Sequence, residues 1–159
     1  MKTIFFIWTV IKLFFFTSVS VAGPDGDKDL NPKIEAVGNN ITVIHLTEAT
    51  FKQMVFDYEK NKEWKYAGKI PAIIDFYADW CAPCRQLSPI VEEIAKDYQG
   101  KIIVYKVDTE KERKLAQNIG ISALPTLLFI PMEGKPQVSM GVLPKASLVK
   151  AINDILQVK

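Results

Sequence analysis

Apolar and polar residues alternate along this chain in blocks that predict strands separated by helices. Short apolar runs, several of them rich in β-branched residues, predict strands at 41–44, 70–76, 102–107, 126–130 and 137–140. Apolar residues at helical spacing predict helices at 48–60 and 81–98, a third that begins at 109 or 110 and ends at 120, and a fourth at 146–158. This order predicts an α/β fold with a central mixed sheet of about five strands, flanked by about four helices.

The first 40 residues differ in composition from the rest of the chain. Residues 1–22 contain Lys2, an apolar run interrupted by Lys12 and a small-residue end at Ala22, which is typical of a cleaved secretory signal peptide. An uncleaved membrane anchor is the alternative, although Lys12 falls in the middle of the apolar run. Residues 23–40 are rich in Gly, Pro, Asp and Asn and predict a flexible leader before a domain at 41–159. We therefore expect an exported protein, either periplasmic or secreted.

The charge balance limits the classes of partner. Of the 20 Lys and Arg residues, Lys2 and Lys12 lie in the predicted signal peptide, which leaves 18 basic against 18 acidic residues. A neutral domain has no electrostatic footprint for nucleic acid, so no nucleic-acid partner is expected.

Two cysteines, Cys81 and Cys84, lie where a predicted buried strand turns into a predicted helix. Residues three apart on a first helical turn face the same way, about 5–6 Å apart, so the pair can close a disulfide. The partial positive charge of a helix N-terminus favours a thiolate, which is the species that attacks disulfides. Cys81, nearer the loop, is predicted to be the attacking thiol and Cys84 the resolving thiol.

Other interpretations of this pair are weaker. A zinc site needs about four ligands, and the chain offers two cysteines and a single histidine, His45, so no metal is expected. His45 is better explained as a packed or solvated residue at a strand end. A purely structural disulfide across a two-residue gap would constrain the unfolded chain very little. One cysteine pair in an exported protein therefore favours thiol–disulfide exchange.

The residues around this pair resemble the thioredoxin family over roughly 41–156. The resemblance is carried by the sequence Asp-Phe-Tyr-Ala-Asp-Trp-Cys-Ala-Pro-Cys at 75–84 and by Leu-Pro-Thr at 124–126, with the proline 44 positions after Cys81. It implies the thioredoxin fold, a Cys81–Cys84 disulfide in the oxidised state, and protein-disulfide reductase activity without a cofactor.

The resemblance also implies roles for further residues. Asp75 matches a buried acid behind the cysteines; burial in an apolar strand should raise its pKa, so that it can accept the proton of Cys84 through a water. The alternative is a strand-end acid that reaches solvent. Lys106 matches the lysine that faces this acid, and Pro125 matches a cis-proline. The expected substrate-binding residues are Trp80, Ala82, Pro83, Leu124, Gly141 and Val142.

The redox direction stays open at this stage. Ala82 stands where thioredoxins mostly have glycine, and the dipeptide between the cysteines helps to set the reduction potential. We expect a monomer that reduces disulfide-containing exported proteins and is re-reduced by an upstream thiol or electron donor, with a membrane reductase as one candidate. The alternatives are a disulfide oxidase or isomerase of secreted proteins and a non-catalytic binding or chaperone module.

Overall fold

The computed structural model describes residues 33–37 and 40–159. The predicted signal peptide at 1–22 lies outside the described residues and stays a prediction. The strands are β1 Lys33–Val37, β2 Asn40–His45, β3 Ala72–Tyr77, β4 Ile103–Asp108, β5 Thr126–Ile130 and β6 Gln137–Met140. The helices are α1 Glu48–Met54, α2 Ala82–Asp97, α3 Arg113–Ile119 and α4 Lys145–Ala151, which continues as a π-helical turn, Ile152–Leu156.

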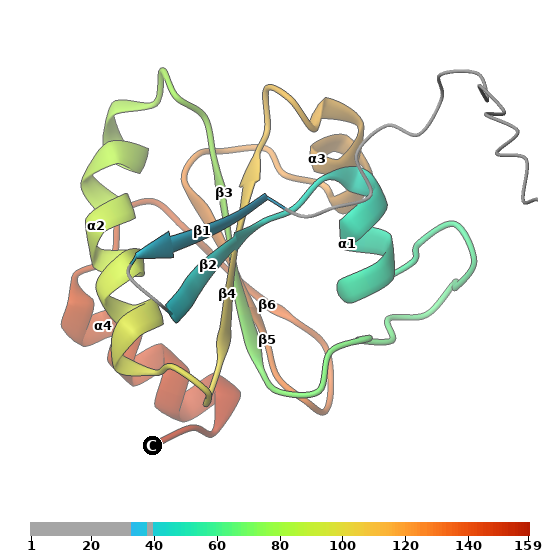
Figure 1. Cartoon of the computed structure of the whole chain (residues 1–159). Coiled ribbons are helices and arrows are strands. Elements are labelled where there is room, and N and C mark those ends of the chain that lie inside the picture. Colours follow the sequence, from blue (N-terminus) through green and yellow to red (C-terminus); the bar gives the residue numbers. More distant parts are fainter. Residues whose placement is uncertain (1–32, 38–39) are drawn as a thin grey trace, which may run out of the picture.

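The strands form one mixed sheet in the order β1-β2-β4-β3-β5-β6. β4 runs parallel to both β2 and β3, whereas the other neighbours are antiparallel. Figure 1 shows α2 and α4 on one side of the sheet and α1 and α3 on the other. The predicted fold class is therefore confirmed, and β1 adds one strand to the five that were expected.

Strand β1 differs from the flexible leader expected over residues 23–40. Lys33–Val37 pairs antiparallel with β2, with an irregularity in register between Glu35 and Ala36. The sequence of this segment partly alternates polar and apolar residues, which is a pattern of edge strands. That short signal was obscured by the Gly- and Pro-rich composition around it. Pairing with β1 covers an edge of β2 that would otherwise present unpaired backbone groups.

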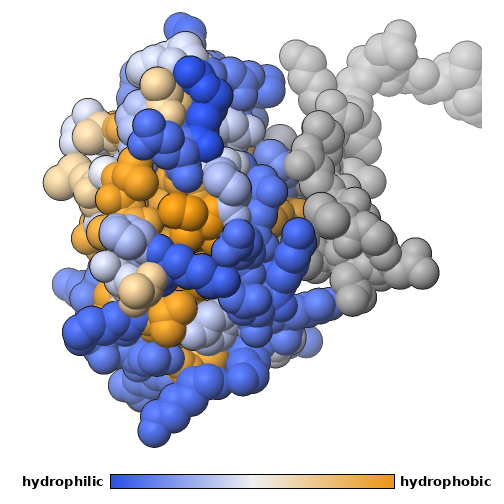
Figure 2. Space-filling model, turned by 90° about the vertical axis from the view of Figure 1, so that its left-hand side faces the viewer, coloured by the Kyte–Doolittle hydropathy of each residue, from blue (hydrophilic) through white to orange (hydrophobic). Residues whose placement is uncertain are grey.

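The core lies in two layers because alternate residues of each strand face opposite sides of the sheet. Ile73, Val104 and Leu127 face α2 and α4 and pack with apolar residues of those helices. Ile74 and Tyr105 face the other side and pack in the cluster of α1 and α3. Figure 2 looks at the side of α2 and α4 and shows mostly hydrophilic side chains, with apolar surface exposed between them.

The loop between α1 and β3 contributes to the second layer. Trp64 and Tyr66 pack against its buried cluster, and the rings of Phe56 and Trp64 have centroids 4.8 Å apart. The two aromatic residues of this loop therefore form a local packing patch. Among the described residues, no helix is long and apolar enough to cross a membrane.

Two helices are shorter than their periodicity predicts. α1 has its N-cap at Thr47, whose side chain accepts a hydrogen bond from the backbone of Thr50, but it ends at Met54 rather than near residue 60. α3 begins at Arg113 instead of residue 109 or 110. The preceding residues form a turn in which the Asp108 carboxylate accepts the backbone N–H of Glu110. Such local side-chain bonds compete with helical ones.

The packing of α2 against the sheet gives a test of the core. Ile94 lies on the buried face of α2 and is 1% exposed. Replacing it with alanine leaves a cavity, so Ile94→Ala should lower the free energy of unfolding by about 2–5 kcal/mol in urea denaturation. Lys96→Ala, on the exposed side of the same helix, is the matched control and should change it by less than about 0.5 kcal/mol. Equal effects of the two variants would contradict this account of the core.

Candidate active site

The site begins where β3 ends and α2 starts. Cys81 is the N-cap of α2, and its Sγ accepts a hydrogen bond from the backbone N–H of Cys84 at 3.2 Å. Pro83 lies in the first turn, where a missing N–H costs no helical bond. The two cysteines form a disulfide with a Cα–Cα distance of 5.3 Å. The first helical turn thus holds both sulfurs together, as the three-residue spacing predicts.

The two cysteines face different spaces although each residue is only 3% exposed. Cys81 lines an open cavity of about 450 Å³, whereas Cys84 lines a separate cavity of about 230 Å³ that also contains Asp75. A substrate that enters the larger cavity therefore meets Cys81 first. The division into an attacking and a resolving thiol stays a prediction, and this asymmetry is compatible with it.

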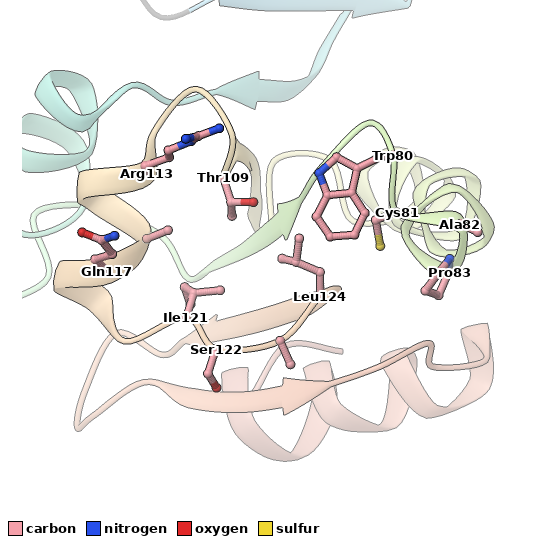
Figure 3. Close-up of a pocket in the computed structure, with 12 residues that line it drawn as sticks. Trp80, Cys81, Ala82, Pro83, Thr109, Arg113, Gln117, Ile121, Ser122 and Leu124 are labelled. Atoms are coloured by element: carbon pink, nitrogen blue, oxygen red, sulfur yellow. The ribbon is translucent and has the colours of Figure 1, made fainter.

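The larger cavity, drawn in Figure 3, has two different ends. Trp80, Cys81 and Leu124 lie together at one end, and the Trp80 side chain remains 68% exposed. Ala82 and Pro83 also line the cavity on this side. An exposed apolar ring and an apolar rim next to a sulfur suit contact with a peptide that carries a disulfide.

The opposite end of the cavity is polar and was not predicted from the sequence. Thr109, Arg113 and Gln117 line it, from α3 and the turn before it. Arg113 donates a hydrogen bond to the Glu110 carboxylate at 2.8 Å. They lie 25 or more positions from the cysteines in the sequence and carry no local sequence signal, because only the packing of α3 and the turn before it beside the site brings them there.

Pro125 and the start of the segment after β6 lie side by side. The Leu124–Pro125 peptide bond is cis, as the family resemblance implies. The Gly141 N–H donates to the carbonyl oxygen of Pro125 at 2.9 Å, and Gly141 has a φ of 88°, in the left-handed region that favours glycine. Val142 follows and is 39% exposed. Gly141 and Val142 do not line the cavity of Figure 3, so they border the site next to Pro125.

Asp75 is buried behind the disulfide. It is 1% exposed, so it does not reach solvent at the strand end. Its Cα pairs in register with Lys106 on β4, and both side chains line the smaller cavity with Cys84. Burial raises the pKa of Asp75 to about 6, although the Lys106 ammonium opposes the shift. A carboxyl with this pKa can exchange protons near neutral pH, and the cavity that Asp75 and Cys84 both line has room for a water.

The sequence did not predict the contacts of two residues, Ser88 and Tyr77, with Lys106. The Lys106 ammonium donates a hydrogen bond to Ser88 Oγ and lies 4.9 Å from the centroid of the Tyr77 ring. Ser88 follows Cys84 by four positions, so its place on the same helical face could have been inferred. Its contact with Lys106 could not be inferred.

His45 packs edge-on near Tyr77, with ring centroids 6.3 Å apart. Among the described residues, no group of three or more His, Cys, Asp or Glu side chains is arranged to hold a metal ion.

Comparison with known proteins places the chain in a family. The family model for thioredoxin matches residues 42–154. The chain belongs to the thioredoxin family. It is 52% identical over 111 residues to a thioredoxin of Borreliella burgdorferi, a match that covers 70% of this chain and 95% of the relative. Thioredoxin 1 of Nostoc sp. is 37% identical over 107 residues, covering 67% of this chain and 91% of the relative.

A solved structure supports the same fold. Chloroplastic thioredoxin z superposes with a TM-score of 0.58 at 24% identity, covering 70% of this chain and 91% of that one. Together with the Cys81–Cys84 pair, family membership makes this chain a thioredoxin-type protein-disulfide reductase.

The raised pKa of Asp75 has a consequence for stability. Between about pH 4, where an unfolded Asp ionises, and pH 6, the folded protein holds a proton that the unfolded chain lacks. Stability contributed by this group is therefore lost as the pH rises through 6. Asp75→Asn removes the buried charge, so it should stabilise the oxidised protein by about 2–3 kcal/mol more at pH 8 than at pH 4 in urea unfolding. An equal change at both pH values would show that Asp75 ionises normally.

Proposed function

We propose that this thioredoxin-family reductase is exported and reduces disulfide bonds of other exported proteins through Cys81 and Cys84. The observation that carries the reaction is the separation of the two sulfurs: Cys81 lines the open cavity, and Cys84 lines the buried cavity that holds Asp75. Export is inferred from the sequence pattern of residues 1–22, an apolar segment with early lysine and a small-residue end.

The first step is attack by Cys81 on the substrate. The N-terminus of α2 stabilises the Cys81 thiolate through its partial positive charge and through the N–H of Cys84, which points at Cys81 Sγ. The thiolate forms a mixed disulfide with one substrate sulfur. The substrate S–S bond breaks, and the other substrate sulfur leaves as a thiolate that takes a proton from solvent.

The second step is resolution by Cys84. Asp75 accepts the Cys84 proton through a water in the cavity that both residues line. The Cys84 thiolate then attacks Cys81 Sγ, closes the Cys81–Cys84 disulfide and releases the second substrate sulfur. Two electrons pass from the dithiol to the substrate. A dithiol donor upstream must return them; for an exported protein we infer a membrane reductase as this donor.

Substrate binding uses the rim of the open cavity. The backbone of Leu124 precedes the cis bond to Pro125, beside the cysteines, where an extended substrate segment can pair with it as an added strand. Trp80 supplies exposed apolar surface next to Cys81 and Leu124. Contacts made by backbone and apolar surface accept many sequences, which suits a reductase that acts on several proteins.

The reducing direction is supported by the residues between the cysteines. A cationic histidine there would stabilise the thiolate and make the disulfide a stronger oxidant. Ala82 and Pro83 carry no charge. In titration against glutathione, the mature protein should therefore have a reduction potential below about −200 mV, near the thioredoxin end of the known range. A value above about −150 mV would favour an oxidase or isomerase instead.

The division of labour between the cysteines can be tested by trapping. Cys84→Ser should accumulate mixed disulfides on Cys81, visible as higher-mass bands on non-reducing gels that disappear with reductant, because resolution is blocked. Cys81→Ser is the matched control and should trap no partners, since the remaining thiol faces the buried cavity.

The trapped partners also test the compartment. Mass spectrometry of the bands should identify exported proteins, and the trapped chain should begin at Gly23. Partners found solely in the cytoplasm would overturn export and leave the exchange chemistry intact. Trapping by Cys81→Ser and not by Cys84→Ser would overturn the assigned roles.

A further inference from the structure

The ammonium of Lys106 is a charge held inside the protein. Lys106 is 8% exposed, and its Nζ donates to Ser88 Oγ while it lies over the ring of Tyr77. The neighbouring Asp75 carboxylate is not hydrogen-bonded to it through Oδ1, because that atom is buried without a hydrogen-bond partner. The lysine is thus fixed close to the acid by a third residue, on a different element.

The hydroxyl of Ser88 has a defined orientation. An ammonium can only donate, so Ser88 Oγ accepts from Lys106 and its own proton is free for another acceptor. Glu92 Oε1 lies 3.3 Å from Ser88 Oγ and can take it. Cys84, Ser88 and Glu92 are spaced by four positions and share one face of α2. Donated hydrogen bonds therefore run outward, from the buried ammonium through the serine to a carboxylate at the surface.

We propose that Ser88 is a positioning residue of the exchange reaction: its hydroxyl, oriented by Glu92, holds the Lys106 ammonium beside the Asp75 carboxylate and prevents a direct bond between them. The inference rests on the role proposed for Asp75. A direct ion pair would keep Asp75 charged and make it a poor acceptor for the Cys84 proton. Held by Ser88, the lysine acts on Asp75 through its field alone.

The other groups around Asp75 do not replace this contact. Tyr77 lies on the same strand and meets Lys106 through its ring face. Arg85 and Asp79 line the mouth of the cavity, both exposed, and the Arg85 guanidinium donates to the backbone oxygen of Asp79. Cys84 of α2 also lines the cavity. On β5, the residue opposite Asp75 is the uncharged Leu127. Lys106 is therefore the buried cation that faces the acid, and Ser88 decides where it sits.

Removal of the hydroxyl should redirect the ammonium. In Ser88→Ala, Lys106 loses its acceptor, and a buried ammonium without one is costly. Asp75 Oδ1, on the strand paired in register with Lys106, is an acceptor without a partner. We expect the two to bond, so the Asp75 titration should move down by about one pH unit or more. The measurement is a ¹³C NMR titration of the Asp75 carboxyl in the oxidised protein.

Two matched variants isolate the contact. Ser88→Thr keeps a hydroxyl at the same position and should restore the wild-type titration. In a Lys106→Met background, Ser88→Ala should produce no further shift, because the cation that moves is gone. An unchanged or upward Asp75 titration in Ser88→Ala would overturn the proposal, and so would a downward shift that persists without Lys106.

Kinetics separate this inference from the function on which it rests. In single-turnover reactions, Ser88→Ala should slow resolution of the mixed disulfide at neutral pH several-fold and leave its formation by Cys81 little changed. If Asp75 titrates lower in Ser88→Ala and resolution keeps its wild-type rate, the position of Lys106 is as proposed and Asp75 is not the proton acceptor. If resolution slows equally with and without Lys106, the positioning role of Ser88 is overturned.

Discussion

The chemistry of this protein depends on one junction, where a strand buried on both faces leads through the short turn 78–81 into the first turn of a helix. Apolar packing on both sides fixes β3, so the residues at its end have little freedom. The first turn of the helix that follows directs the backbone N–H of Cys84 at Cys81 Sγ. A thiolate needs such fixed donors, because donors that had to reorganise during the reaction would stabilise it less.

The same junction separates two environments that the reaction needs. On one side of the disulfide the surface is open and partly apolar, so Cys81 can meet a protein substrate. On the other side lies a small buried space with Asp75, Lys106 and Cys84. Burial raises the pKa of Asp75 to about 6, which is close to neutral pH. A more exposed acid would be ionised too readily to exchange protons usefully at that pH.

A buried carboxyl and a buried ammonium are expensive to keep next to each other without a bond. The fold manages this with α2, which supplies the resolving thiol, the hydroxyl that holds the lysine and the surface carboxylate beyond it at successive turns of one face. Reactivity and charge placement are thus carried by a single helix packed on the sheet. Its apolar residues, such as Leu87 and Ile94, anchor both at once.

The sequence alone determined the order of the main elements and the position of the cysteine pair, and it favoured the burial of Asp75. Each of these features follows from a local pattern in the sequence: apolar runs, helical spacing, or an acid among core residues. Strand β1 and the late start of α3 were not predicted. A short edge strand has only a weak local signal, and the turn before α3 is held by a side-chain bond of Asp108 that competes with helical bonds. Only the tertiary structure decided which cavity each sulfur faces, brought Thr109, Arg113 and Gln117 beside Cys81, and set Ser88 against Lys106. Those contacts join residues far apart in the chain, and the packing of α2 and α3 on the sheet creates them.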